Sequence, residues 1–417
     1  MPGNRRVVIV GGGFGGLYAA KALANRPVDV VLIDRKNHHT FQPLLYQVAS
    51  SVISPSQIAI PLRHILRRAR NVEVLLGEVS GIDIGAKEVS LSSGSKISYD
   101  YLIVAAGSRH SYFGHDDWEK NAPGLKTIED ATEMRRRILL AFEMAERQQF
   151  ETGGHEPVTF AIVGGGPTGV ELAGAVADIA RLVVAPDYKS IDTKQSRVIL
   201  FEGAPDVLGT YPQPLRDKAR RQLEELGVEV RTGAMVSDVR ADAIKVGEEW
   251  VPVKATLWAT GVAASSLGRM LGGETDKAGR VKLNSDLSVP GRPEVFVVGD
   301  MASLKDVKGV VVPGLASAAT QMGPFAAHNI LRLVRGETTQ GFAYKDKGTL
   351  ATIGKNRAIA WIAGLQLSGF IAWLTWGLVH VVLLIGFRNK FLVMWEWAWT
   401  YFTGQRSARL ITGPPTD

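Results

Sequence analysis

The sequence predicts an α/β protein in which one unit occurs twice: a buried strand, a glycine-rich loop, a helix and a second strand. The first copy has its apolar strand at residues 6–10 and its loop at 11–16. The second copy has its strand at 158–163 and its loop at 164–169. An apolar, tryptophan-rich segment follows residue 360. We therefore predict two Rossmann-like dinucleotide-binding domains, the second inserted in the first, and a C-terminal helical membrane-attachment region.

Both loops have the glycine spacing GxGxxG. The glycines concerned are Gly11, Gly13, Gly16, Gly164, Gly166 and Gly169. The strand after each helix ends in an acid, Asp34 in the first copy and Glu202 in the second. Such glycines let the backbone approach a pyrophosphate, the helix N-terminus favours the anion, and the acid accepts hydrogen bonds from a ribose. One copy could be an ordinary glycine turn, but two complete copies favour two dinucleotides.

Composition excludes several classes of chemistry. The chain has 417 residues, 48 Lys plus Arg, 41 Asp plus Glu and no cysteine. Without cysteine there is no disulfide, thiolate zinc site or catalytic thiol, so electron transfer needs a bound organic cofactor. The sequence has no basic tract interleaved with aromatic residues, so we do not expect nucleic acid binding. We also expect no metal site. Basic clusters at 63–70 and 135–137 fit either solvated helix faces or a surface beside an anionic membrane.

The C-terminal segment is expected to contact a membrane. Six of the nine tryptophans lie between residues 361 and 399, and residues 361–387 carry no formal charge. As one helix this stretch would be about 40 Å long, enough for a single span, although its four glycines permit breaks. Tryptophans beside Arg388 and Lys390 suit the headgroup region. We expect monotopic attachment, with a single span as the alternative. We also expect a homodimer, and an interface formed by the same helices is compatible with either form of attachment.

The N-terminal sequence shows no signal peptide, because the first strand begins directly after Arg5 and Arg6. The body of the protein is therefore expected on the cytoplasmic face of the cell membrane.

The chain resembles the flavoproteins with two dinucleotide-binding domains and, among them, the type II NADH:quinone oxidoreductases. The resemblance is carried by residues 41–49 (FQPLLYQVA), 164–174 (GGGPTGVELAG), 295–301 and 386–390. It implies a membrane-associated enzyme that passes two electrons from NADH through non-covalent FAD to a membrane quinone without ion pumping. The domains implied are FAD-binding at 1–110 and 266–360, a connecting helix and linker at 111–154, NADH-binding at 155–265 and a membrane anchor at 361–417.

The resemblance also implies site residues. Those expected to hold FAD are Gly11, Gly12, Gly13, Phe14, Gly15, Asp34, Arg35, Val79, Asp300, Ala316 and Ser317. Those expected to hold NADH are Gly164, Gly166, Gly169, Glu202 and Gly261. Glu202 would accept from the ribose 2′-hydroxyl of NADH but repel the 2′-phosphate of NADPH, and the following residues 203–205 offer no arginine for that phosphate.

Glu171 and Gln321 are the catalytic candidates. Glu171 corresponds to the family's glutamate near the flavin, which is implicated in proton handling; the alternative is an acid in the first helical turn, stabilised by the helix dipole. The family commonly has two glutamines before its C-terminal FAD helix. Here Ser317 replaces the first and Gln321 keeps the second, so the sequence departs from the family at one of the two points that would position the quinone.

Two other functions remain open. A ferredoxin or rubredoxin reductase would pass the electrons to a protein, but the apolar C-terminal segment argues against it. A flavin-bearing redox sensor would show little turnover. Disulfide reductases and sulfide oxidoreductases of the same fold need redox cysteines, which this sequence lacks.

Overall fold

The chain forms two compact units, each assembled from three stretches of sequence. The computed structural model describes residues 4–154 and 156–413. Unit 1 comprises Met1–Thr40, Ala59–Arg109 and Val262–Lys347, and unit 2 comprises Phe41–Ile58, His110–Gly261 and Gly348–Asp417. The insertion of one unit within the sequence of the other, expected from the order of the two glycine loops, is therefore present.

Two stretches group differently from the predicted domain boundaries. Residues 41–58 and 348–360 belong to unit 2, although the sequence interpretation assigned them to the first domain and its continuation. The first stretch contacts the C-terminal part of unit 2, where the Trp397 indole N–H donates to Gln47 Oε1 at 2.7 Å. The second packs closely: a Cβ added to Gly174 would lie 1.6 Å from the carbonyl oxygen of Ile353. The functional labels of the five predicted segments stay a prediction, and their outermost residues, 1–3 and 414–417, lie outside the described residues.

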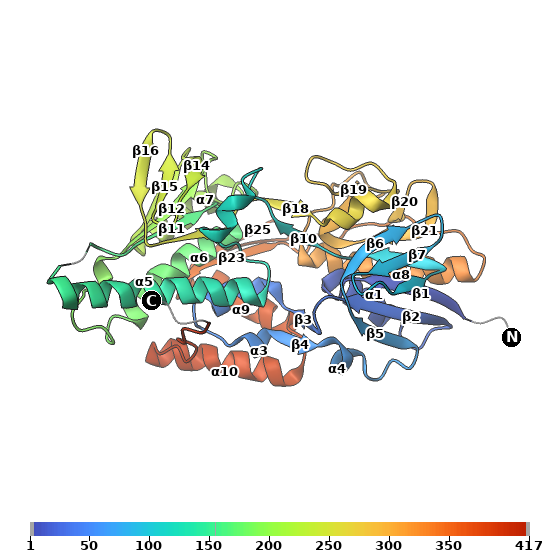
Figure 1. Ribbon diagram of the computed structural model, residues 1–417, viewed down its shortest axis with the longest axis horizontal. Helices are drawn as coiled ribbons and strands as arrows, with labels where there is room; N and C mark the ends of the chain where they lie inside the picture. Colours follow the sequence, from blue (N-terminus) through green and yellow to red (C-terminus); the bar gives the residue numbers. More distant parts are fainter. Residues whose placement is uncertain (1–3, 155, 414–417) are drawn as a thin grey trace. The chain divides into compact units, whose positions relative to one another are not determined.

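Unit 1 is built on a six-stranded sheet with the order β20-β21-β9-β1-β2-β5 (Figure 1). Its strands are β1 (Arg5–Val10), β2 (Val28–Asp34), β5 (Val72–Leu76), β9 (Tyr101–Val104), β20 (Ser288–Val289) and β21 (Arg292–Val297). All neighbours run parallel except β20 and β21. Because such a sheet is covered on both faces, the last four residues of β1, at 7–10, form a continuous apolar run and are all buried.

Helices α1 (Phe14–Leu23) and α8 (Ala316–Val334) pack on each other beside this sheet. A Cβ on Gly323 would lie 2.1 Å from the carbonyl oxygen of Gly15, so this crossing requires glycine. The other elements of unit 1 are β3 (His38–Thr40), β4 (Ala59–Pro61), α4 (Leu62–Leu66), β6 (Val79–Asp83), β7 (Glu88–Leu91), β8 (Lys96–Ser98), β18 (Val262–Ala264), η5 (Ser266–Leu271), β19 (Val281–Lys282), η6 (Gly299–Met301) and β22 (Ala302–Ser303). The sequence division between the units falls within a short strand, β10 (Ser108–His110).

Unit 2 is built on a parallel sheet with the order β13-β12-β11-β17. Its strands are β11 (Thr159–Val163), β12 (Arg197–Glu202), β13 (Val228–Thr232) and β17 (Ala255–Trp258), and the antiparallel sheet β14 (Val236–Val239), β15 (Ala243–Val246) and β16 (Glu249–Pro252) projects beside it (Figure 1). A core containing Phe201 and Trp258 joins the two sheets. The remaining elements before residue 348 are η1 (Gln42–Leu44), α2 (Leu45–Ala49), α3 (Pro55–Ile58), η2 (Asp116–Lys120), α5 (Ile128–Thr152), α6 (Pro167–Asp178), η3 (Ile179–Val183), η4 (Thr193–Gln195) and α7 (Gln213–Glu225).

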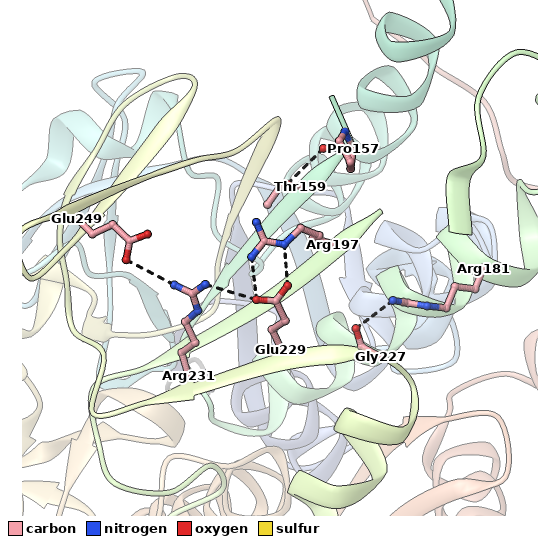
Figure 2. A network of polar contacts seen from close by, with 8 residues as sticks. All are labelled: Pro157, Thr159, Arg181, Arg197, Gly227, Glu229, Arg231 and Glu249. Carbon is pink, nitrogen blue, oxygen red and sulfur yellow. Dashed lines mark hydrogen bonds and ion pairs between the residues drawn. The ribbon is translucent and has the colours of Figure 1, made fainter. Parts of the chain in front are cut away.

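Charged side chains connect β12 with the edge strand β13, and β13 with β16 of the neighbouring sheet. Arg197 donates two hydrogen bonds to Glu229, at 2.7 and 2.9 Å, and Arg231 contacts Glu229 and Glu249 (Figure 2). All four side chains are at least one-third exposed. Exposed ion pairs contribute at most about 1 kcal/mol each, so the apolar core determines the stability of this sheet.

The C-terminal part of unit 2 is a small sheet followed by two helices. Its elements are β23 (Thr349–Gly354), β24 (Arg357–Ile362), β25 (Leu365–Ser368), α9 (Phe370–Leu383) and α10 (Phe387–Thr403). The uncharged stretch 361–387 is not one helix, because Gly364, Gly369 and Gly386 have φ angles of +83°, +72° and +87°. Among the residues described, no helix combines the length and apolarity that crossing a membrane would need.

Candidate active site

The first glycine loop has two closely packed glycines and one open glycine. Gly11 has φ +102°, and a Cβ there would lie 2.4 Å from the carbonyl oxygen of Ala105. A Cβ on Gly16 would lie 1.8 Å from the carbonyl oxygen of Gly11. Gly13, at the N-cap of α1, has no atom within 4 Å of its Cβ position. The outer glycines thus make the tight turn, and the middle one leaves backbone exposed to an incoming phosphate.

The second loop repeats this geometry in unit 2. Gly164 has φ +110°, and a Cβ on Gly169 would lie 1.7 Å from its carbonyl oxygen. Gly166 is the N-cap of α6 and again has open space at its Cβ position. Two loops that share the packing of the outer glycines and the opening at the middle one fit two pyrophosphates.

The predicted acids reach these loops in the same way in both units. The Gly12 N–H donates to Asp34 Oδ2 and the Gly165 N–H to Glu202 Oε2, each at 2.5 Å. The second oxygen of each carboxylate accepts the backbone N–H two residues further along the chain, at 2.7 and 2.8 Å. Each acid is therefore fixed against its loop, where a ribose hydroxyl could donate to its remaining lone pairs.

Glu171 lies in an apolar cavity of about 400 Å³ within unit 2. The cavity wall comes from α2, α6, β23, α9, α10 and the residues after α10, and its aromatic members include Trp376 and Trp397. Burial raises the pKa of the Glu171 carboxyl to about 8, against a smaller opposing effect of the Thr352 backbone N–H. Glu171 is the fifth residue of α6, which has no acid in its first turn. The alternative of an acid in the first helical turn is therefore wrong, because the effect of the helix dipole falls off within that turn and Glu171 lies beyond it.

A hydrogen-bonded pair of side chains from α2 and α10 forms part of this wall. The Trp397 indole N–H donates to Gln47 Oε1 at 2.7 Å, and Gln47 Nε2 donates to the Tyr46 hydroxyl at 3.1 Å. Burial and the neighbouring Glu171 raise the pKa of Tyr46 well above its usual range. The sequence interpretation quoted Tyr46 and Gln47 within a motif but gave them no role, because their partner lies 350 residues away along the chain.

Comparisons with known proteins agree with this arrangement. A family model described as pyridine nucleotide-disulphide oxidoreductase matches residues 5–323, and one described as NDH2 C-terminal domain matches residues 347–406. The type II NADH:quinone oxidoreductase Ndh of Mycobacterium tuberculosis is 44% identical over 99% of this chain and 91% of its own length. The chain belongs to the type II NADH:quinone oxidoreductase family.

Other members of the type II NADH:quinone oxidoreductase family are similar over most of the chain. NdhA of Mycobacterium tuberculosis is 44% identical over 98% of this chain and 90% of its own length. A structure of NDH2 from Plasmodium falciparum in complex with NADH has a TM-score of 0.87 and 21% identity, and the match covers 98% of this chain and all of that one. This structural likeness shows the fold and confirms the predicted α/β class.

In this type II family member, two of the residues predicted near a flavin, Asp300 and Ser317, have side-chain partners within unit 1. The Ser108 hydroxyl donates to Asp300 Oδ2 at 2.7 Å, which orients that carboxylate. Ala316 and Ser317 begin α8, and Ser317 Oγ lies 3.2 Å from the Tyr344 hydroxyl. Sequence reasoning missed Ser108. This residue directly follows a short apolar strand, but nothing in the sequence indicates that its hydroxyl contacts Asp300.

The side-chain amide of Gln321 is bound to backbone. Its Nε2 donates to the carbonyl oxygens of Ser317 and Lys345, at 2.8 and 3.0 Å, and its Oε1 accepts the Lys345 N–H at 3.1 Å. The amide thus ties α8 to the chain that follows it. Its predicted catalytic role stays a prediction.

The remaining predicted cofactor residues have varied surroundings. Arg35 is exposed, Val79 begins β6 half-buried, and Gly15 is buried against Val298. Gly261 has φ +71°, and its Cβ position lies 2.5 Å from the carbonyl oxygen of Ser111. The assignments of these residues to FAD or NADH stay predictions.

His39 is a further residue that the sequence interpretation missed. Its ring contacts Phe14 edge-on at 4.9 Å between centroids, and its Nδ1 lies 3.1 Å from the carbonyl oxygen of Gly12. Burial lowers the pKa of His39 to about 4, so the imidazole is neutral near pH 7. We attribute to it the support of the first glycine loop.

Proposed function

We propose that this chain transfers two electrons from NADH, through non-covalently bound FAD, to a membrane quinone without ion pumping. The observation that carries the proposal is the apolar cavity with Glu171 in its wall, in a chain that also holds two glycine loops of matching geometry. The relatives described above support it, because the family is defined by this reaction. FAD, when bound, supplies the two-electron chemistry.

Unit 1 would hold FAD and unit 2 would hold NADH. The open backbone at Gly13 and the N-terminus of α1 suit the FAD pyrophosphate, and Asp34 suits its adenosine ribose. Gly166 and Glu202 offer the corresponding groups to NADH. Asp300 would accept from a ribityl hydroxyl, with Ala316 and Ser317 beside the flavin ring.

The quinone would bind in the cavity of unit 2. Its apolar wall suits a quinone ring and an attached hydrocarbon chain. Glu171, with its pKa raised to about 8, is mostly protonated at pH 7. It therefore holds a proton in an apolar site, where reduction of a quinone to a quinol consumes protons.

Helices α9 and α10 would attach the enzyme to the membrane from one side, on the cytoplasmic face. Both helices expose large apolar side chains, which together we name the apolar helix surface. It comprises Phe370, Ile371, Leu374, Leu378, Val382, Leu383, Phe387, Phe391, Met394, Trp395, Trp399 and Phe402, each between 45% and 87% exposed. Apolar surface on this scale marks a membrane or protein interface. The alternative is that a second copy of this chain covers the same surface in a homodimer.

Steady-state assays with different electron acceptors test the proposal. The purified protein should contain FAD and should oxidise one NADH for each molecule of a soluble quinone analogue reduced. Turnover with a small iron–sulfur protein but not with quinones would instead support the reductase alternative. Negligible turnover with every acceptor, despite full flavin content, would support the sensor alternative.

A further inference from the structure

Unit 2 has a second, polar cavity, which shares a wall residue with the apolar one. Its volume is about 560 Å³, and its wall comes from α5, the segment after η3, the end of α10 and residues 405–411. The wall includes Glu143, Glu146, Asp187 and Arg409. The Asp187 side chain is 52% exposed, so this cavity reaches the protein surface and water.

Arg406 belongs to the walls of both cavities. Its side chain is only 7% exposed. One end nitrogen, Nη1, donates to the carbonyl oxygen of Ser50 at 2.8 Å, and the other, Nη2, lies 3.8 Å from Asp178 Oδ2. Its Nε has no hydrogen-bond partner among the residues described. A separation of 3.8 Å exceeds a direct hydrogen bond, so Arg406 and Asp178 interact through their charges.

Asp178 is the second carboxyl in the wall of the apolar cavity. It is the last residue of α6, seven residues after Glu171. Seven residues make nearly two helical turns, so both side chains leave the same face of α6 about 10 Å apart along its axis. Both acids line the same cavity, so a proton that passes between them would require bridging water.

The surroundings of Asp178 leave it able to take up a proton. Burial raises its pKa more than the opposing effects of Arg406, the Lys355 backbone N–H, Arg357 and the Lys355 charge lower it. Arg181, in the next turn, donates to the carbonyl oxygen of Gly227 at 3.0 Å (Figure 2), and its charge also interacts with Asp178. Tyr46, on α2, also interacts with Asp178, whose charge contributes to the raised pKa of the Tyr46 hydroxyl. Glu171, on α6 itself, lines the same cavity.

We propose that Asp178 and Arg406 form a proton entry route, in which Asp178 passes protons from water in the polar cavity to Glu171 in the apolar cavity. The inference rests on the proposed quinone reduction. For each proton used, the O–H bond of the Glu171 carboxyl breaks as an O–H bond forms at a quinone oxygen. The Glu171 carboxylate then regains a proton from Asp178, whose own proton is replaced from water beside Arg406. The two electrons come from NADH through the flavin.

Asp178→Asn tests the route, because the amide keeps the shape of the side chain but does not release or take up a proton at the pH values of the assay. We expect the stopped-flow oxidation of reduced enzyme by a soluble quinone analogue to slow at least tenfold, most strongly at alkaline pH. Flavin reduction by NADH and turnover with ferricyanide, which takes electrons without protons, should stay within twofold of wild type. Asp178→Glu, which restores a titrating group, should recover most of the quinone rate.

Glu229→Gln is the matched control, since it removes an acid paired with an arginine in the same unit but outside both cavities. It should change none of these rates. An unchanged quinone rate and pH profile in Asp178→Asn would overturn the route. If Asp178→Asn fails to retain flavin, Arg406→Gln provides the test: loss of the cation should move the pH profile of quinone reduction upward, and an unmoved profile would overturn the route.

Glu171→Gln separates this inference from the proposed function. A slowed quinone reaction in Glu171→Gln beside an unaffected Asp178→Asn would reject the route alone. A wild-type enzyme that never reduces quinones would reject the proposed function.

Discussion

At the scale of single residues, space and burial explain what the sequence could only suggest. The glycine spacing predicted both loops, and the geometry separates glycines needed for packing from those that leave the backbone open. The raised pKa of Glu171 could not be predicted from the sequence, because the apolar wall that causes it comes from segments distant along the chain. The hydrogen bonds between Gln321 and Lys345 could not be predicted for the same reason, because the two residues are 24 positions apart in the sequence.

Gly13→Val should give a folded protein without FAD. The position is free of neighbours within 4 Å and has φ −67°, so valine fits the chain but covers the backbone that a pyrophosphate must approach. Gly166→Val should keep FAD and raise the KM for NADH at least tenfold. Flavin absorbance, circular dichroism and steady-state kinetics check both. Full flavin occupancy in Gly13→Val would contradict the assignment of the first loop.

Gly16→Ala is the control for the loop variants. Its Cβ would lie 1.8 Å from the carbonyl oxygen of Gly11, so this smaller change should prevent folding of unit 1. Soluble expression at the wild-type level would show that the loop tolerates rearrangement.

Glu171→Gln should flatten the pH dependence of quinone reduction. With a pKa of about 8, the Glu171 carboxyl holds its proton below pH 8 and loses it above. The wild-type rate should therefore fall as pH rises through 8, while the Gln variant should be at least tenfold slower below pH 8 and show no such fall. Because folding raises this pKa, ionisation of Glu171 opposes folding at alkaline pH, so the Gln variant should melt no lower than wild type at pH 9.

Glu202→Ala should weaken the preference for NADH over NADPH. The carboxylate accepts two backbone N–H groups and would accept the NADH ribose, but it would repel a 2′-phosphate. We expect the ratio of kcat/KM for the two coenzymes to fall at least tenfold, mainly through a higher KM for NADH. Asp34→Ala, which removes the corresponding acid of unit 1, should leave the ratio unchanged in molecules that retain flavin. An unchanged ratio in Glu202→Ala would show that another residue selects the coenzyme.

At the scale of elements, glycines determine where the C-terminal segment turns. Composition predicted an apolar, tryptophan-rich region and identified its glycines as points where a helix could break. It did not predict that the first part of this region completes the sheet of β23, β24 and β25, because an uncharged apolar run does not distinguish a buried strand from a helix. Ala358 and Ala360 of β24 pack against Ala372 of α9, so these elements share one core.

This packing predicts different outcomes for two truncations. Deletion of residues 361–417 cuts β24 and removes its α9 partner, so the product should be insoluble. Deletion of residues 386–417 keeps the sheet and α9 but removes Trp397 and Arg406 from the wall of the apolar cavity. We expect a folded protein that NADH still reduces and that reacts at least tenfold more slowly with quinone. Flavin content and rapid kinetics check the result, and wild-type quinone kinetics would exclude the cavity as the quinone site.

At the scale of the whole molecule, duplication made the fold predictable. Two copies of one strand–loop–helix–strand unit, the second nested in the sequence of the first, predicted the order of the chain, and the loops of both copies have equivalent geometry. The assignment of residues 41–58 and 348–360 to unit 2 could not be predicted, because it depends on contacts such as that between Gly174 and Ile353.

The apolar helix surface should hold the enzyme to membranes mainly by burial. Fully burying one large apolar side chain is worth about 1.5–3 kcal/mol, whereas a lysine or arginine near an anionic surface adds about 1 kcal/mol that salt weakens. The full-length protein should therefore stay with membranes in high salt and leave them in detergent.

Joint replacement of Phe387 and Phe402 by aspartate should lower its partition to neutral lipid vesicles at least tenfold, since these side chains are 87% and 82% exposed. Phe150→Asp is the control, because Phe150 is 86% exposed on α5, outside that surface. Release by salt alone, or an equal loss in Phe150→Asp, would contradict attachment through α9 and α10.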